Sequence, residues 1–258
     1  FNQEESLRDF VFDFKVHGII FCTVLSILAG GIINQFYDHE KDQLTKPFRT
    51  KIQNFLKQKY FLYAYLILVA TSLTTAFLIS PRVFYFFLVY QFFMWFYSHK
   101  LSKILIINNI TFVSLTLYPF FGMMVYYHTF SGKVFLMAVF LFLMLLVMDI
   151  LKDILTKNAD KIFGYTTIPN TFGTRNAVNV VVALSVLLFT VSMLIISNTG
   201  IHSILPLYFA AGLFVIILSV YLLLSSVKKS NFIVLNIFRI WVFVGIIAML
   251  LDGIIERF

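Results

Sequence analysis

Three oxygen-bearing side chains at four-residue spacing close the first long apolar run of this sequence: Asn34, Asp38 and Asp42. On a helix, a four-residue step returns to nearly the same face, so the three side chains form a column of oxygen ligands over two turns. Mg²⁺ prefers oxygen ligands and usually binds through a few carboxylates together with substrate phosphates. The spacing therefore predicts a magnesium site. The alternative is an ordinary solvated helix end whose acids pair with Lys41 and Lys46.

A second set of acids follows the apolar run 141–148 and consists of Asp149, Asp153 and Asp160. Steps of four and seven residues return to nearly the same helical face, so a helix that continues through this segment carries a second acidic column. Acids next to a membrane boundary are costly and mark functional sites by default. The alternative is again a capped and solvated helix end.

The composition identifies an integral membrane protein. The 258 residues are 60% hydrophobic and only 12% charged, with a mean hydropathy of +0.90. Continuously apolar runs of about 20 residues are long enough as helices to cross a hydrocarbon core of about 30 Å, and they lack the short alternating strands of a barrel. The single cysteine, Cys22, excludes an internal disulfide framework. The net charge of +8 is not interpreted as nucleic-acid binding, because the basic residues lie in short loops.

These runs predict an all-α fold, a polytopic transmembrane helix bundle that forms a single domain over residues 1–258. Eight spans are expected, at 16–36, 60–79, 83–97, 104–127, 134–150, 177–196, 201–224 and 232–251. The third span is short and begins after Pro81, so a thin or kinked crossing is expected there.

The basic residues are distributed asymmetrically between the two sides of this predicted bundle. The loops after the first, third, fifth and seventh spans hold 14 of the 20 Lys and Arg residues, and the other side holds five. The positive-inside rule therefore places residues 38–59, 99–103, 152–175 and 228–229 in the cytoplasm, and both ends of this chain outside. Both acidic motifs then lie on the cytoplasmic side. The remaining basic residue, Arg239, lies inside the last span.

Further motifs accompany the two acidic columns. The first column is followed by Lys46, Pro47 and Arg49. Asp153 and Asp160 are followed by a turn-rich stretch with Gly164, Thr167, Ile168, Pro169 and Gly173. Between the two columns stand Tyr97, Ser98 and Lys103, with Asn109 beyond. In this joint order and spacing the chain resembles, over nearly its whole length, the UbiA superfamily of intramembrane prenyltransferases. That family pairs an Asn/Asp-rich motif after its second helix with an Asp-rich motif after its sixth.

The chain departs from the family pattern at several positions. Gln35 and Thr156 stand where the family usually has a further Asp, and Thr45 stands where it often has Asn. Each departure loses a charge or a ligand. The family fold has nine helices, whereas here the first motif follows the first span, so the family's opening helix is expected to be missing from this chain.

The resemblance implies ionisation of an allylic prenyl diphosphate and transfer of its prenyl group to an aromatic or other lipophilic acceptor. The implied cofactor is Mg²⁺, which would bridge both motifs and the diphosphate at the cytoplasmic face. The implied metal contacts are Asn34, Asp38, Asp42, Asp149, Asp153 and Asp160, of which Asp38, Asp42, Asp153 and Asp160 are the expected catalytic residues. Candidate diphosphate clamps are Arg49, Lys103 and Lys161, with Arg49 best suited to bidentate contacts.

Two other functions remain open from the sequence. Gln35, Thr156 and the expected absence of the family's first helix favour a catalytically weakened homologue that serves as a structural subunit of a membrane complex. A transporter is also conceivable, although its acids would be expected at the midplane and not at one surface. Prenyl diphosphate, a lipophilic acceptor and membrane lipids are the expected partners, with a possible membrane complex and no nucleic acid. The expected location is the bacterial cytoplasmic (inner) membrane.

Overall fold

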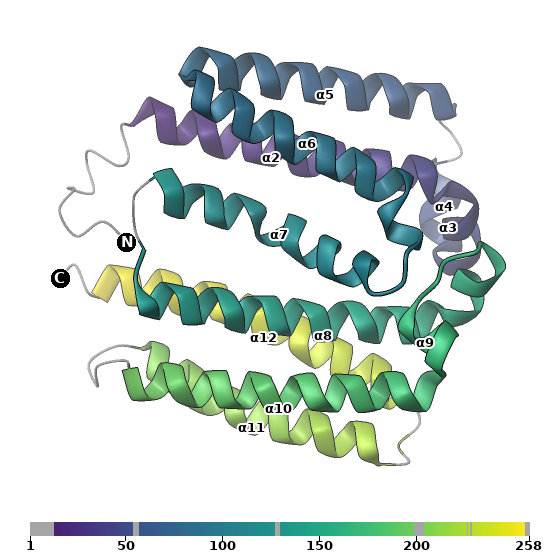
Figure 1. The fold of residues 1–258 in the computed structure, drawn as a ribbon, viewed down its shortest axis with the longest axis vertical. Coiled ribbons are helices and arrows are strands. Elements are labelled where there is room, and N and C mark those ends of the chain that lie inside the picture. The colour runs from purple at the N-terminus through teal and green to yellow at the C-terminus, as the bar shows by residue number, and fades with distance from the viewer. Residues whose placement is uncertain are drawn as a thin grey trace. The chain divides into compact units, whose positions relative to one another are not determined.

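The computed structural model describes residues 13–53, 57–126, 130–198, 204–225, 227 and 229–255, and within these ranges it contains helices and no strands (Figure 1). In chain order the helices are α2 (Phe14–Tyr37), α3 (His39–Thr45), α4 (Pro47–Gln53), α5 (Gln58–Ile79), α6 (Pro81–His99), the short 3₁₀ helix η1 (Leu101–Lys103), α7 (Ile107–Tyr126), α8 (Gly132–Ile162), α9 (Ile168–Phe172), α10 (Thr174–Asn198), α11 (Leu205–Leu224) and α12 (Ser230–Ile255).

A helix is present at each of the eight predicted spans, and seven of these helices are long and apolar enough to cross a membrane within the described residues. The eighth is α6, the predicted short span, whose 19 residues include Tyr, Trp, Gln and His, which are less apolar than Leu, Ile or Val. Pro81 occupies its first turn, and the Ser80 hydroxyl accepts a hydrogen bond from the Val83 N–H. The chain is thus an integral membrane protein with an all-helical fold.

The chain divides into two compact units, each described by itself below. The N-terminal unit comprises Asn2–Tyr127 and Asn158–Tyr165, and the C-terminal unit comprises His128–Lys157 and Thr166–Phe258. The single domain expected from the sequence remains a prediction. Three basic residues used in the topology prediction lie outside the described residues: Arg8, Lys228 and Arg257.

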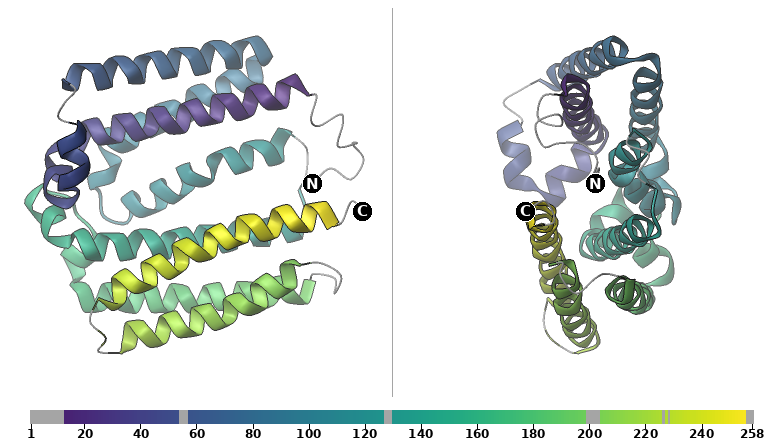
Figure 2. Two further views of the ribbon diagram at one scale, coloured as in Figure 1. Left: turned by 180° about the vertical axis from the view of Figure 1, so that it is seen from behind. Right: turned by 90° about the vertical axis from the view of Figure 1, so that its left-hand side faces the viewer.

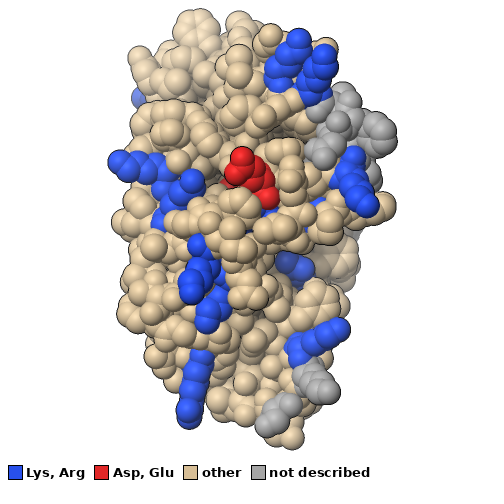
Figure 3. All heavy atoms as spheres, turned by 90° about the vertical axis from the view of Figure 1, so that its right-hand side faces the viewer, with Lys and Arg blue, Asp and Glu red and all other residues tan. Residues whose placement is uncertain are grey.

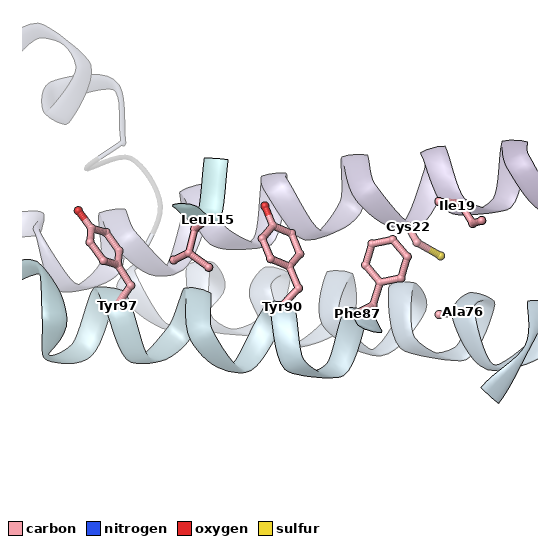
Figure 4. Packing of buried hydrophobic residues seen from close by; sticks show 7 residues of the cluster. All are labelled: Ile19, Cys22, Ala76, Phe87, Tyr90, Tyr97 and Leu115. Carbon is pink, nitrogen blue, oxygen red and sulfur yellow. The ribbon is translucent and has the colours of Figure 1, made fainter. Parts of the chain in front are cut away.

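In the N-terminal unit, α2, α5 and α6 lie side by side (Figure 1). Their buried face, joined by α7, holds a hydrophobic cluster in which Tyr90 and Phe87 are among the largest fully buried side chains (Figure 4). The Tyr90 ring stacks on Tyr118 of α7, with ring centroids 4.9 Å apart. In a soluble protein, removing this aromatic surface from water would stabilise the fold by about 25 cal/mol per Å² of buried area. In a bilayer, the same contacts stabilise the fold mainly through close packing.

Small polar residues bring α2 and α5 together inside this unit. The hydroxyls of Ser26 and Ser72 lie 3.1 Å apart, and the Ser72 hydroxyl donates to the Cys22 carbonyl at 3.2 Å. From α6, the Gln91 amide donates to the Ser26 hydroxyl at 3.0 Å. Because these side chains are small and buried, the two backbones approach closely, which is the usual basis of helix association in membranes.

The C-terminal unit contains most of α8 together with α9, α10, α11 and α12, and α11 runs beside both α10 and α12 (Figures 1 and 2). Tyr208 of α11 stacks on Trp241 of α12 at 4.8 Å and donates to its backbone carbonyl at 3.2 Å. The buried carboxylate of Asp252 accepts the Ile204 N–H at 2.7 Å at the start of α11. An acid at this position satisfies a donor that the helix cannot satisfy itself.

Helix α8 is the element that carries the second acidic motif. It continues to Ile162, about 18 Å beyond the predicted end of its span at residue 150. The helix ends before Gly164, whose φ is +71°. A residue with a side chain adopts this left-handed backbone conformation only at an energetic cost, whereas glycine adopts it readily. The second acidic motif therefore lies on one continuous helix, which is the condition that the sequence left open.

The close approach of α2 and α5 predicts that Ser72→Leu destabilises the protein. The larger side chain loses the hydroxyl contacts and forces the two backbones apart, which should cost about 1–3 kcal/mol. The measurement is the thermal unfolding midpoint in detergent, with Thr74→Leu on the exposed side of α5 as the control. Equal midpoints for the two variants would contradict this packing.

Candidate active site

The first acidic motif stands at a break between two helices. Helix α2 ends at Tyr37, and Asp38 (φ −91°, ψ 7°) separates it from α3. The four-residue hydrogen-bond step nevertheless continues, with the Asp38 N–H on the Asn34 carbonyl at 2.9 Å and the Asp42 N–H on the Asp38 carbonyl at 2.8 Å. The Asn34 amide also donates to the Asp38 carboxylate at 3.2 Å. The predicted column of side chains is therefore present.

The two lysines of this motif behave differently. Lys46 is half-exposed and pairs with Asp42 at 2.9 Å, which is the local pairing expected of a solvated helix end. Lys41 does not form the local pair proposed in that alternative, because its ammonium lies 2.5 Å from the carboxylate of Asp160. The solvated-end interpretation is thus only partly right for the first motif.

Asp160 is the most deeply buried acid of the second motif. Its side chain has 0% exposure, and Lys41, its partner, has only 15%. Both residues belong to the N-terminal unit, because the end of α8 is part of that unit. A carboxylate removed from water needs a counter-charge of good geometry, and the Lys41 ammonium provides it. The contact therefore joins the first motif to the second.

Tyr165 makes a second connection between the motifs. It follows Gly164 in the turn after α8, and its N–H binds the Asp160 carbonyl at 2.8 Å. Its hydroxyl donates a short hydrogen bond to the Asp38 carboxylate. The Lys41 ammonium lies over its ring at 3.9 Å from the centroid, and Lys103 lies 5.3 Å from the same centroid. A cation over an aromatic face is attracted by the ring quadrupole.

The surroundings of Tyr165 keep its phenol protonated. Burial raises its pKa well above the ordinary value of 10.0, and the neighbouring carboxylates of Asp38 and Asp160 raise it further because they oppose a phenolate. Since a raised pKa favours the neutral form in the folded protein, the phenol remains a donor toward Asp38 through neutral and mildly alkaline pH. Stability linked to this group is lost only as the pH rises above about 10, where the unfolded chain ionises.

The remaining acids of the second motif lie in the C-terminal unit. Asp149 and Asp153 are each 3% exposed, and Asp149 pairs with Lys152 at 2.9 Å. Burial of these acids contradicts the alternative of a solvated helix end. Thr156 donates its hydroxyl to the Lys152 carbonyl at 3.1 Å, a hydrogen bond within its own helix.

The basic residues proposed as diphosphate clamps occupy three places. Lys103, in η1, and Lys161, near the end of α8, are exposed. Arg49 belongs to α4, and its side chain lies outside the described part of the structure. The Lys103 ammonium lies 5.3 Å from the ring centroid of Tyr165, which itself contacts Asp38. The two ends of the turn that contains η1 are connected by a hydrogen bond, which the Tyr97 hydroxyl of α6 donates to the Asn108 side chain of α7 at 2.8 Å.

The donor set fits Mg²⁺ that is shared with a phosphate ligand and does not fit a metal held by protein alone. No three acidic, His or Cys side chains gather as a ready-made metal cage within the described ranges. Asn34, Asp38, Asp42 and Asp160 supply oxygen atoms only, and Mg²⁺ typically uses one or two carboxylates together with substrate phosphates. On the face shown in Figure 3, basic side chains are spread widely and acidic ones are visible in one place, in keeping with the burial of Asp42 and Asp160.

Two functional candidates were not predicted from the sequence, namely the Lys41–Asp160 contact and the Tyr165–Asp38 contact. Only the alternative of a solvated helix end gives Lys41 a partner, and that partner is local because sequence spacing shows only neighbours on the same helix. For Tyr165 the available signal was its position directly after a turn glycine and five residues beyond Asp160.

Comparisons with known proteins agree on one family. The model of the UbiA prenyltransferase family matches residues 8–243. A digeranylgeranylglyceryl phosphate synthase of Thermococcus gammatolerans is 28% identical over 225 residues, which are 84% of this chain and 78% of the relative. The enzyme of the same name from Methanosphaera stadtmanae is 30% identical over 175 residues, 67% of this chain and 64% of the relative.

Two solved structures show the same fold. A UbiA homologue from Archaeoglobus fulgidus bound to DMAPP and Mg²⁺ superimposes with a TM-score of 0.70 at 15% identity, covering 97% of this chain and 87% of the other. A structure of digeranylgeranylglyceryl phosphate synthase gives a TM-score of 0.69 at 21% identity, covering 93% and 86%. At these identities the likeness establishes the fold.

A helical membrane fold with acidic motifs at the ends of two helices is the architecture of an intramembrane prenyltransferase. The chain belongs to the UbiA prenyltransferase family, since the family model matches far more than half of it. The functional class and the helical membrane fold expected from the sequence are thereby confirmed.

The geometry around Tyr165 predicts that Tyr165→Phe lowers kcat/KM for prenyl transfer by about tenfold, because a hydrogen bond to a charged group is lost. Since the phenol stays protonated, the ratio of wild type to variant should be constant from pH 7 to about 9. Steady-state assays across this range provide the check, with Tyr63→Phe on the exposed side of α5 as the control. A ratio that falls toward unity as the pH rises would show that the phenol ionises and would contradict the assignment.

Proposed function

We propose that this prenyltransferase moves a polyprenyl group from an allylic prenyl diphosphate to the hydroxyl of a glyceryl phosphate lipid, with Mg²⁺ at the cytoplasmic face. The observation that carries the proposal is the joining of the two acidic motifs by Lys41 and Tyr165. The name shared by the matched relatives, digeranylgeranylglyceryl phosphate synthase, supports a glyceryl phosphate acceptor. The aromatic acceptor allowed by the sequence is the less supported choice.

The proposed reaction breaks one C–O bond and forms another. The bond between prenyl C1 and the diphosphate oxygen breaks, and its electron pair leaves with the diphosphate. A lone pair of the acceptor hydroxyl forms the new bond to C1, and the hydroxyl proton is taken up by the released diphosphate. Because the leaving group gains negative charge as the bond breaks, stabilisation of that charge is the main task of the site.

The residues proposed to hold the metal and the diphosphate are those of the N-terminal unit. Asn34, Asp38, Asp42 and Asp160 are proposed as direct or water-mediated ligands, and bound Mg²⁺ would neutralise charge on the diphosphate. Structures of Archaeoglobus fulgidus homologues with DMAPP or GPP and Mg²⁺ support this pairing of metal and diphosphate. Asp149 and Asp153 remain predicted ligands.

Tyr165 donates to one oxygen of the Asp38 carboxylate and the Asn34 amide donates to the other, so the carboxylate is held in one orientation. Lys103, which already lies close to the Tyr165 ring, is proposed to contact the diphosphate. Arg49 and Lys161 are proposed as further clamps, each following an acidic motif in the sequence. The buried surroundings of Asp160 keep water away from the site and strengthen these charge interactions.

The membrane is proposed to be a prokaryotic cytoplasmic membrane. The matched relatives named above are archaeal, so an archaeal type of glyceryl phosphate lipid has more support than the bacterial source expected from the sequence. Membrane lipids surround the spans, and the lipid acceptor is proposed to enter from the bilayer. A complex with other membrane proteins has no support among these observations.

The proposed site predicts that Asp42→Asn lowers the rate of diphosphate release by about 10²–10³-fold, because one of the groups that stabilise leaving-group charge is lost. Purified protein is assayed with geranylgeranyl diphosphate, a geranylgeranylglyceryl phosphate acceptor and Mg²⁺. Glu40→Gln is the matched control, since Glu40 is an exposed acid on the same short helix.

Absence of diphosphate release by the wild type, with either a glyceryl phosphate or an aromatic acceptor, would refute the enzymatic proposal and favour a structural subunit. Equal losses in both variants would show that net charge on α3 matters and not the position of Asp42.

A further inference from the structure

Lys41 occupies an unusual position for a lysine. It lies one residue before Asp42 in the first acidic motif, yet its ammonium reaches the fully buried carboxylate of Asp160 and the ring of Tyr165. Its side chain is 15% exposed, whereas Lys46, one turn away, is 50% exposed and pairs with its own helix. A lysine ammonium is strongly hydrated, so its burial requires nearby compensation by an anion or an aromatic face.

The charges of the motifs show why such a cation is tolerated. Beside their acids, the two motifs carry uncharged polar side chains, among them Gln35 and Thr156. An ammonium lies next to one of the carboxylates that the motifs do hold. A site with few carboxylates attracts metal cations less strongly than a site with many. A positive side chain in the same place stabilises bound diphosphate directly.

We propose that Lys41 is a permanent cation of the diphosphate site. Its ammonium neutralises Asp160 in the metal-free protein, and it contacts the diphosphate when Asp160 is a ligand of bound Mg²⁺. This inference rests on the proposed function. The lysine has three N–H donors on a flexible stem, so it can exchange one anion for another by rotation of the side chain. A buried ammonium that loses its carboxylate requires a new anion nearby, and the diphosphate supplies it.

The first test uses wild-type protein and needs no substitution. The rates at which an amine-reactive ester acylates individual lysines are measured by mass spectrometry in EDTA, in Mg²⁺, and in Mg²⁺ with inorganic diphosphate. Lys41 should react slowly in EDTA, about tenfold faster in Mg²⁺ alone because the buried ion pair is broken, and slowly again with diphosphate. Lys51, an exposed lysine on α4, is the control and should keep one rate. A Lys41 rate that is the same in all three conditions would overturn the proposal.

The second test measures binding without turnover. Mn²⁺ replaces Mg²⁺ as a paramagnetic probe, and its affinity is compared in wild type, Lys41→Met, Lys41→Arg and the control Lys51→Met. Lys41→Met should bind Mn²⁺ about tenfold more tightly, because Asp160 is no longer neutralised, and should bind diphosphate in the presence of Mn²⁺ about tenfold more weakly. Lys41→Arg and Lys51→Met should resemble wild type.

Unchanged affinity for both ligands in folded Lys41→Met would show that the lysine is only a structural tie. If Lys41→Met does not fold, the labelling rates in wild type decide the question. Failure of the proposed function has a different signature, namely normal Mn²⁺ and diphosphate binding without prenyl transfer.

Discussion

A carboxylate with no contact with water must be compensated, and the compensation of Asp160 by Lys41 is the interaction around which the N-terminal part of the site is arranged. To satisfy it, α8 must continue to residue 162, the chain must turn at Gly164, and α3 must present Lys41 toward the end of α8. The same arrangement brings Tyr165 onto Asp38. Loss of either charge would leave the other buried alone, which is the most costly state of such a pair. The contact therefore constrains both motifs together, although they are far apart in the chain.

The membrane spans make this arrangement possible because they are held together by small, internally paired groups. The Ser26 and Ser72 hydroxyls pair between α2 and α5, and the Gln91 amide donates to Ser26 from α6. Aromatic contacts such as Tyr90 on Tyr118 fill the space between α6 and α7. The acids of the two motifs lie toward the helix ends, where charged groups cost less than at the bilayer centre. Packed helices are rigid, so they fix the positions of the charged side chains at their ends.

The sequence was informative wherever the signal is local. Apolar runs of membrane length predicted a helix at every span, and the four-residue spacing placed Asn34, Asp38 and Asp42 on one face even though a helix boundary falls at Asp38. The end of α8 was less predictable, because hydropathy falls at Asp149 while the helix continues to Ile162 and buries its acids. The partners of Lys41 and Tyr165 could not be predicted in this way. They depend on a turn with positive φ and on tertiary packing, whereas spacing along a helix predicts only local pairs such as Lys46 with Asp42.

The central claim is that the first acidic motif and Asp160 act as one site. A double-mutant cycle of Asp42→Asn and Asp160→Asn, measured as the rate of diphosphate release with Mg²⁺, tests it most directly. If both acids stabilise the same leaving group, the double variant should be little slower than the slower single variant. Losses that multiply, as expected for independent sites, would contradict the account.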